Sequence, residues 1–157
     1  MHMNDGAAGK ETGMREQALK AIRSKIVIVE ADELMAAVYK RLFLREEDRF
    51  ICSLERNAED ALDNLRREPA DILILDWDMP GISGLQMLDA LRANHATKLL
   101  PVIVVSSRAG IEERIQALRH GANDYLSKPF DVHELLARLQ VLLRRTEIYT
   151  KTRPKTT

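Results

Sequence analysis

The sequence has little that would cross-link a fold or bind a soft metal. It contains a single cysteine, Cys52, which excludes an intrachain disulfide and a cluster of thiolate ligands. Its four histidines show no metal-ligand spacing. Its 24 basic residues balance 24 acidic ones, so it has no general basic surface for nucleic acid. It also lacks an apolar run long enough to span a bilayer and any signal-peptide pattern. We therefore expect a soluble cytoplasmic protein with no direct nucleic-acid partner and no membrane partner.

The 157 residues, of which 45% are hydrophobic, are enough for one domain with a substantial core. Residues 1–24 contain few large apolar side chains and predict a flexible leader, with at most a short helical segment. Residues 25–145 carry the periodic patterns of a folded domain. Residues 146–157 are basic and polar, which predicts a tail or a truncated linker, and Pro154 would end any helix there.

Short aliphatic runs alternate with segments of helical spacing along the folded part. The central runs are apolar at consecutive positions, which is typical of parallel strands covered by helices on both faces. We expect five strands, at residues 25–29, 50–54, 71–75, 101–105 and 124–127. Strict alternation of five strands with five helices predicts a three-layer α/β fold with an open, doubly wound parallel sheet.

The helices are predicted from apolar residues three or four positions apart. Two of these stripes, after the first strand and after the fourth, are expected to face the core through Leu34, Val38, Leu42, Ile111, Ile115 and Leu118. Asp32 and Asp131 are expected to cap helix N-termini, and Gly121 to end the helix that precedes it.

Polar residues follow four of the five predicted strands at the point where each strand ends. They are Glu30, Asp76, Ser106 and Lys128. The carboxyl ends of parallel strands face one edge of the sheet, where ligands bind. Asp76 and the nearby Asp78 repel each other unless a cation or a proton compensates them, and Lys128 is a suitable cation. The sequence therefore predicts a pocket at this edge that can accept an anion.

Three segments around these residues resemble the receiver domain of two-component response regulators, over roughly residues 24–145. They are LDWDMPGISG after the third strand, VVSS after the fourth and DYLSKPF around the fifth. The resemblance implies a flavodoxin-like, CheY-like fold with strand order 2-1-3-4-5. It also implies that Asp76 accepts a phosphoryl group, that Lys128 neutralises the phosphoryl oxygens, and that Ser106 and Tyr125 then switch position. An ordinary packing role stays the alternative for Tyr125.

The resemblance further implies a magnesium ion and two classes of protein partner. Glu30, Asp76 and the backbone carbonyl of Asp78 would hold Mg²⁺. A sensor histidine kinase or a phosphotransfer protein would supply the phosphoryl group. A downstream effector protein or domain, or a second copy of the chain, would bind the surface formed by the fourth helix, the fifth strand and the fifth helix. The chain would then be a phosphoprotein of a signalling relay rather than an enzyme.

The chain departs from the family pattern after the first strand. Most receivers have two adjacent acids there, and the second is usually a direct metal ligand. Here Glu30 fills the first place and Ala31 the second, which weakens the expected Mg²⁺ site. Asp32, one place further on, is either a helix cap or a substitute ligand. Asp78 would lie near the phosphoryl group, and we predict that Arg108 pairs with it across the mouth of the site.

Two other functions stay open. The loss of an acid at Ala31 is compatible with a phosphorylation-independent pseudo-receiver that serves as a protein-interaction domain. The Asp-x-Asp of DWD also resembles haloacid-dehalogenase-type phosphatases. That likeness is thin, because Pro80 stands where a threonine or valine is expected and no later acidic pair follows.

Overall fold

The computed structural model describes residues 5–108 and 110–152. Its strands are β1 (Ser24–Val29), β2 (Phe50–Glu55), β3 (Ile72–Asp76), β4 (Val102–Ser106) and β5 (Asp124–Ser127). Its helices are α1 (Asp5–Ile22), α2 (Glu33–Arg45), α3 (Ala58–Arg67), α4 (Gly84–Ala93), α5 (Ile111–Arg119) and α6 (Val132–Thr152). Each predicted strand is confirmed to within one residue at either end. The predictions for residues 1–4 and 153–157, including Pro154, lie outside the described residues.

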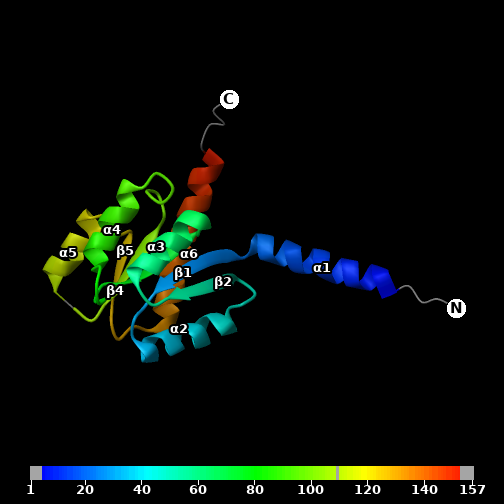
Figure 1. The fold of residues 1–157 in the computed structure, drawn as a ribbon, viewed down its shortest axis with the longest axis horizontal. Coiled ribbons are helices and arrows are strands. Elements are labelled where there is room, and N and C mark those ends of the chain that lie inside the picture. Colours follow the sequence, from blue (N-terminus) through cyan, green and yellow to red (C-terminus); the bar gives the residue numbers. More distant parts are fainter. Residues whose placement is uncertain (1–4, 109, 153–157) are drawn as a thin grey trace.

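The five strands form one parallel sheet in the order β2-β1-β3-β4-β5, which confirms the expected topology (Figure 1). β1 pairs with β2 on one side and with β3 on the other, so Val29 lies beside both Glu55 and Leu75. The chain runs from β1 outward to β2 and then returns to β3. This reversal is the topological switch point, where the carboxyl ends of open α/β sheets bind ligands.

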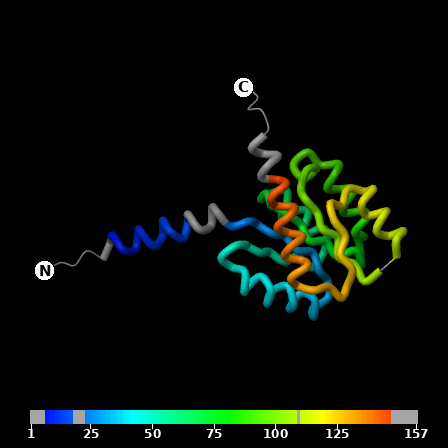
Figure 2. Tube along the Cα trace, turned by 180° about the vertical axis from the view of Figure 1, so that it is seen from behind, coloured from blue at the N-terminus to red at the C-terminus, as the bar shows by residue number. Residues whose placement is uncertain are grey.

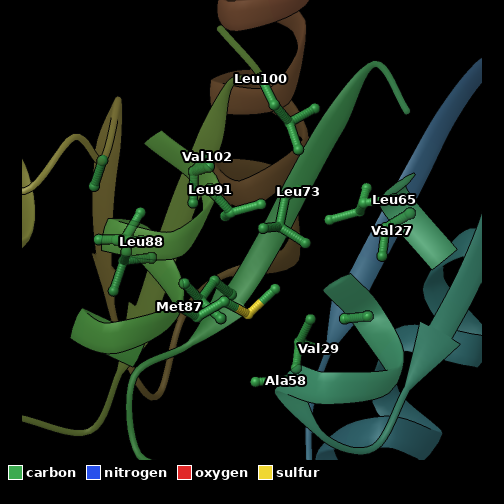
Figure 3. Packing of buried hydrophobic residues seen from close by; sticks show 14 of the residues in the cluster. Val27, Val29, Ala58, Leu65, Leu73, Met87, Leu88, Leu91, Leu100 and Val102 are labelled. Carbon is green, nitrogen blue, oxygen red and sulfur yellow. The ribbon is translucent and has the colours of Figure 1, made fainter. Parts of the chain in front are cut away.

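One face of the sheet is covered by α3, α4 and α5. The buried cluster on this face includes, as labelled in Figure 3, Val27, Val29, Ala58, Leu65, Leu73, Met87, Leu88, Leu91, Leu100 and Val102. The opposite face is covered by α2 and α6, and its cluster includes Ile26, Ile28, Tyr39, Leu42, Phe43, Ile72, Ile74, Leu135 and Leu139. Adjacent strand residues such as Ile28 and Val29 therefore point to opposite faces and are both buried, which explains the continuous apolar runs.

Two of the expected helical stripes do not face the core. On α2 the buried residues are Ala36, Tyr39, Leu42 and Phe43, whereas Leu34 is 80% and Val38 42% exposed. On α5 only Ala117 is buried, and the whole predicted stripe of Ile111, Ile115 and Leu118 is exposed. Both helices carry apolar residues on more than one face, so spacing alone selected the wrong one. The burial of Leu42 is as predicted.

The described part of the chain contains six helices rather than the expected five. The additional helix, α1, occupies most of the predicted leader and leads away from the layered body (Figures 1 and 2). Its sequence contains four alanines, two glutamates and two lysines, whose helix propensity outweighs that of Gly6, Gly9 and Gly13. Among the helices described, none has the length and apolar character needed to cross a bilayer.

Candidate functional site

The four strand-end residues predicted from the sequence meet at the carboxyl edge of the sheet. Glu30 follows β1, Asp76 and Ser106 end β3 and β4, and Lys128 follows β5. The Nζ atom of Lys128 lies 3.4 Å from Oδ1 of Asp76 and 3.3 Å from Oε2 of Glu30. The Lys128 backbone N–H also donates to the Ser106 carbonyl at 2.7 Å, which holds the loop after β5 against β4. One ammonium group therefore bridges the two buried carboxylates.

Glu30 is the most strongly perturbed acid of the site. It is fully buried, and this burial together with the adjacent Asp76 raises its pKa to about 7, while Lys128 acts in the opposite direction. Burial, and to a smaller extent the same two acids, also raises the pKa of Tyr39, whose ring stacks on Phe130 at 5.9 Å. Sequence reasoning missed the placement of Tyr39 and Phe130 near the site, because nothing in their spacing distinguishes them from core aromatics.

The two oxygens of Asp76 differ in their surroundings. Oδ1 accepts a hydrogen bond from the Asp78 backbone N–H at 3.1 Å and lies beside Lys128. Oδ2 has no backbone or cationic donor among the described residues, and the Glu30 side chain is also hydrogen-bonded to the Asp76 carboxyl group. A carboxylate that is oriented through one oxygen can present the other for nucleophilic attack.

The side chain of Asp78 contacts three residues of the segment that ends β4 and follows it. Its Oδ1 pairs with Nε of Arg108 at 2.9 Å, which confirms the predicted pair. Its Oδ2 accepts hydrogen bonds from the hydroxyls of Ser106 at 3.4 Å and Ser107 at 3.3 Å. The Ser106 hydroxyl in turn accepts from the Arg108 backbone N–H at 3.0 Å. The hydroxyl expected to act as a switch is therefore bonded to Asp78 and to its own loop.

Tyr125 is joined to the same loop from the other side. Its side chain is buried within the cluster under α4 and α5, and its hydroxyl donates to the Arg108 carbonyl at 2.5 Å. The guanidinium of Arg114 on α5 lies 5.6 Å from the centre of the Tyr125 ring. Tyr125 thus contacts both the loop after Ser106 and the helix that this loop enters.

The oxygen donors at this edge suit Mg²⁺ in kind but are one carboxylate short. Mg²⁺ prefers carboxylate, carbonyl and water oxygens, and Glu30, Asp76 and the carbonyl of Asp78 are of that kind. Asp32 caps α2 through a hydrogen bond from the Met35 backbone N–H at 2.8 Å, so the cap interpretation is confirmed. Within residues 5–108 and 110–152, no three histidine, cysteine or acidic side chains converge as a metal-binding group.

The backbone carbonyl of Ala31 is hydrogen-bonded to a residue that sequence reasoning passed over. Arg56, directly after β2, donates through Nη2 to the Ala31 carbonyl at 2.6 Å. The available signal was its position, because it follows a strand end just as Glu30 and Lys128 do. A cation therefore contacts the backbone of the residue at which the second acid is expected.

Comparison with known proteins gives one consistent result. The sequence matches the response regulator receiver domain family over residues 26–140. It is 35% identical over 123 residues to the phosphate regulon transcriptional regulatory protein PhoB of Rhizobium meliloti (strain 1021), a match that covers 78% of this chain and 53% of that protein. The chain spans about half the length of the curated relatives it matches.

Two solved structures show the same fold. The receiver domain of the Francisella response regulator 1452 is 31% identical, with a TM-score of 0.72, over 79% of this chain and 99% of that one. The receiver domain of a sensor histidine kinase from Pseudomonas aeruginosa PAO1, described with a magnesium ion coordinated in its active site cleft, is 25% identical with a TM-score of 0.71. That match covers 77% of this chain and 98% of the other.

Proposed function

The chain belongs to the response regulator receiver domain family, a family of signalling modules, and from this we propose that it accepts a phosphoryl group on Asp76 and changes one of its surfaces in response. The observation that carries the proposal is the position of Lys128. Its ammonium lies within 3.4 Å of Asp76 and is itself mostly buried, so it can neutralise charge that arrives on that carboxylate.

The reaction needs positioning and charge neutralisation more than covalent help from the protein. Oδ2 of Asp76 attacks the phosphorus of a phosphohistidine on a partner protein. The O–P bond forms, the P–N bond breaks with its electron pair, and the imidazole of the partner leaves. Lys128 turns from Glu30 toward the phosphoryl oxygens as their charge reaches the site. A bound Mg²⁺, held by Glu30, Asp76 and the carbonyl of Asp78, would supply further positive charge, more weakly than a site with a second acid at Ala31.

Ser106 and Tyr125 carry the proposed response. Once a phosphoryl group is present, its oxygens compete with Asp78 for the Ser106 hydroxyl, and the loop after β4 follows that hydroxyl inward. The same loop is bonded to Tyr125 and leads into α5, which is attached to the core by few buried residues. The proposed output surface is therefore α5, β5 and α6, the fourth and fifth helices of the sequence prediction with the strand between them.

The partners are those that membership of the family implies. The phosphoryl donor is a sensor histidine kinase or a phosphotransfer protein, and the occupant of the output surface is an effector protein or domain, or a second copy of the chain. The exposed apolar residues of α5 supply contact area on that surface: Ile111, Ile115 and Leu118. We expect no direct contact of this domain with nucleic acid, because its charge is balanced.

A phosphorylation-independent interaction domain is the second candidate, and Ala31 favours it. The two candidates differ in whether a cation enters the site. Trp77 is half-buried and adjoins Asp76, so its fluorescence reports on that place. A change in Trp77 fluorescence that saturates at millimolar Mg²⁺ supports the phosphorylated module. No change, together with no modification of Asp76 by acetyl phosphate, supports the interaction domain.

The decisive experiment is phosphorylation of the purified chain by acetyl phosphate with Mg²⁺, read by intact mass and by peptide mapping. We expect one phosphoryl group, on Asp76. Asp76→Asn should abolish it, while Asp63→Asn, which changes an exposed aspartate on α3, should leave it unchanged. Absence of modification in the unaltered chain, under conditions in which a known receiver is modified, would refute the proposal.

A further inference from the structure

Arg56 is placed to reach the same edge of the sheet as the phosphoacceptor. The registers align Val29 with Glu55 on one side and with Leu75 on the other, so the residues that follow these three are level with one another: Glu30, Arg56 and Asp76. Neighbouring strands lie about 4.8 Å apart, so Arg56 and Asp76 are separated by about two strand spacings, which an arginine side chain and a phosphoryl group span together.

The segment that starts at Arg56 also lies beside the loop that follows Asp76. A side-chain carbon added at Gly81, in the loop after β3, would lie 3.9 Å from Oε1 of Glu59 in the first turn of α3. The stretch from Arg56 to Glu59 therefore contacts the loop after β1 at one end and approaches the loop after β3 at the other. Glu30 and Asp76 lie at the start of these two loops.

Arg56 differs from the other two cations of the site, Lys128 and Arg108, in the kind of group that it contacts. Lys128 is paired with Glu30 and Asp76, and Arg108 with Asp78. The contact recorded for Arg56 within the described residues is a neutral carbonyl, that of Ala31, and its side chain is exposed. A guanidinium that gives up one neutral hydrogen bond loses little when it turns toward an anion, and its planar fork matches two phosphoryl oxygens.

We propose that Arg56 binds the phosphoryl oxygens on Asp76 and supplies charge that a more strongly held divalent cation would otherwise supply. This inference rests on the proposed function. It joins two features that have no common explanation otherwise, the missing acid at Ala31 and the unneutralised cation bonded to that residue's carbonyl. The adduct of this chain should then tolerate removal of Mg²⁺.

Beryllofluoride binding to the full chain tests this, because the ion mimics a phosphoryl group on an aspartate and its adduct is read by ¹⁹F NMR. Affinity is measured with excess Mg²⁺ and with EDTA. We expect binding in both, and Arg56→Gln should weaken binding in EDTA by about tenfold to a hundredfold, as for the loss of a charge-assisted hydrogen bond. Its effect with Mg²⁺ should be smaller. Arg56→Lys, which keeps the charge without the fork, should lie between the two.

Two further variants separate this role from a structural one. Arg66→Gln removes an exposed arginine from α3 and should change neither affinity. Ala31→Asp should make binding more dependent on Mg²⁺ and less dependent on Arg56. Circular dichroism and urea unfolding verify that each variant is folded.

The outcomes are distinguishable. Binding that requires Mg²⁺ and is equal in the unaltered chain and Arg56→Gln overturns the role of Arg56 and leaves the proposed function intact. Equal losses of beryllofluoride affinity in Arg56→Gln and Arg66→Gln also overturn the role of Arg56. The same holds if Arg56→Lys restores no affinity and Arg56→Gln loses as much affinity with Mg²⁺ as in EDTA. An absence of any adduct, with Mg²⁺ or without, overturns the proposed function and this inference with it.

Discussion

Replacement of Glu30 by glutamine should stabilise the domain, and by an amount that grows with pH. Glu30 is fully buried beside Asp76, and its pKa is raised from 4.5 to about 7. Between these two values the folded protein holds a proton on Glu30 that the unfolded chain has released. The free energy of unfolding of the unaltered protein therefore falls as pH rises through this window. Glutamine has nearly the same shape and no proton to lose.

The magnitude follows from the shift. One unit of pKa corresponds to about 1.4 kcal/mol, so a shift from 4.5 to about 7 corresponds to about 3 kcal/mol once Glu30 is fully ionised. Below pH 4.5 the acid is protonated in both states, and the two proteins should differ little. In Glu30→Gln, Lys128 loses its ion pair with residue 30 but keeps the one with Asp76. The lost ion pair therefore removes only part of the gain in stability.

Urea unfolding of both proteins in EDTA, at intervals from pH 4 to pH 8, measures this difference. The chelator removes any cation that would favour ionised Glu30. The stability of the variant minus that of the unaltered protein should rise with pH, mainly between pH 4.5 and 7. Glu112→Gln changes an exposed acid on α5 and should give a flat difference. A flat or falling difference for Glu30→Gln would refute the view that burial beside Asp76 dominates at this position.

Three further substitutions test other parts of the structure. Asp78→Asn should increase the initial rate of modification by acetyl phosphate several-fold. It removes a negative charge from the mouth of the site and weakens the hydrogen bond that holds the Ser106 hydroxyl. An unchanged or slower rate contradicts this. Arg92→Ala should lower the free energy of unfolding in urea by about 2–4 kcal/mol, since the half-buried guanidinium donates to four backbone carbonyls, those of residues 97, 98, 100 and 121. Asp32→Ala should cost about 1 kcal/mol in the same assay through loss of the α2 cap.

The strand-end residues were predictable because their signal is local. Each strand is a short apolar run, and a parallel sheet brings whatever follows each run to one edge. Glu30, Asp76, Ser106 and Lys128 could therefore be placed together without any knowledge of side-chain contacts. Arg56 obeys the same rule, but it is preceded by Glu55, also polar, so the end of β2 is not marked by a change from apolar to polar.

The buried faces of α2 and α5 were not predictable by the same reasoning. Leu34 and Val38 keep helical spacing with Leu42, yet the bulkier Tyr39 and Phe43 turn α2 by roughly a third of a turn and leave the first two exposed. On α5 the apolar stripe is genuine but faces outward, because the helix contacts the sheet through the small Ala117. Spacing identifies a stripe, and only packing against the rest of the chain decides whether that stripe meets the core or a partner.

The two ends of α5 are held very differently. At the end of the helix, the Arg92 guanidinium donates twice to the Gly121 carbonyl, at 2.6 and 3.1 Å, and His120 contacts Asp89 of α4 at 2.7 Å. At its start, Gly110 provides no side-chain cap. The helix is therefore anchored at its C-terminal end, away from Asp76.

The N-terminal end of the helix is joined to the candidate site through the loop after β4. Arg108 lies two residues before Gly110, the N-cap residue of α5. Its backbone N–H donates to the Ser106 hydroxyl, and its carbonyl accepts from the Tyr125 hydroxyl. In the proposed response, a displacement of Ser106 toward Asp76 acts on α5 at its N-terminal end, where Ile111 is 72% exposed. Because the other end is fixed by Arg92, we infer that the helix responds by tilting rather than by sliding. A small movement at a buried hydroxyl would then become a larger reorientation of the exposed apolar stripe, which is the part of the surface that a partner would contact.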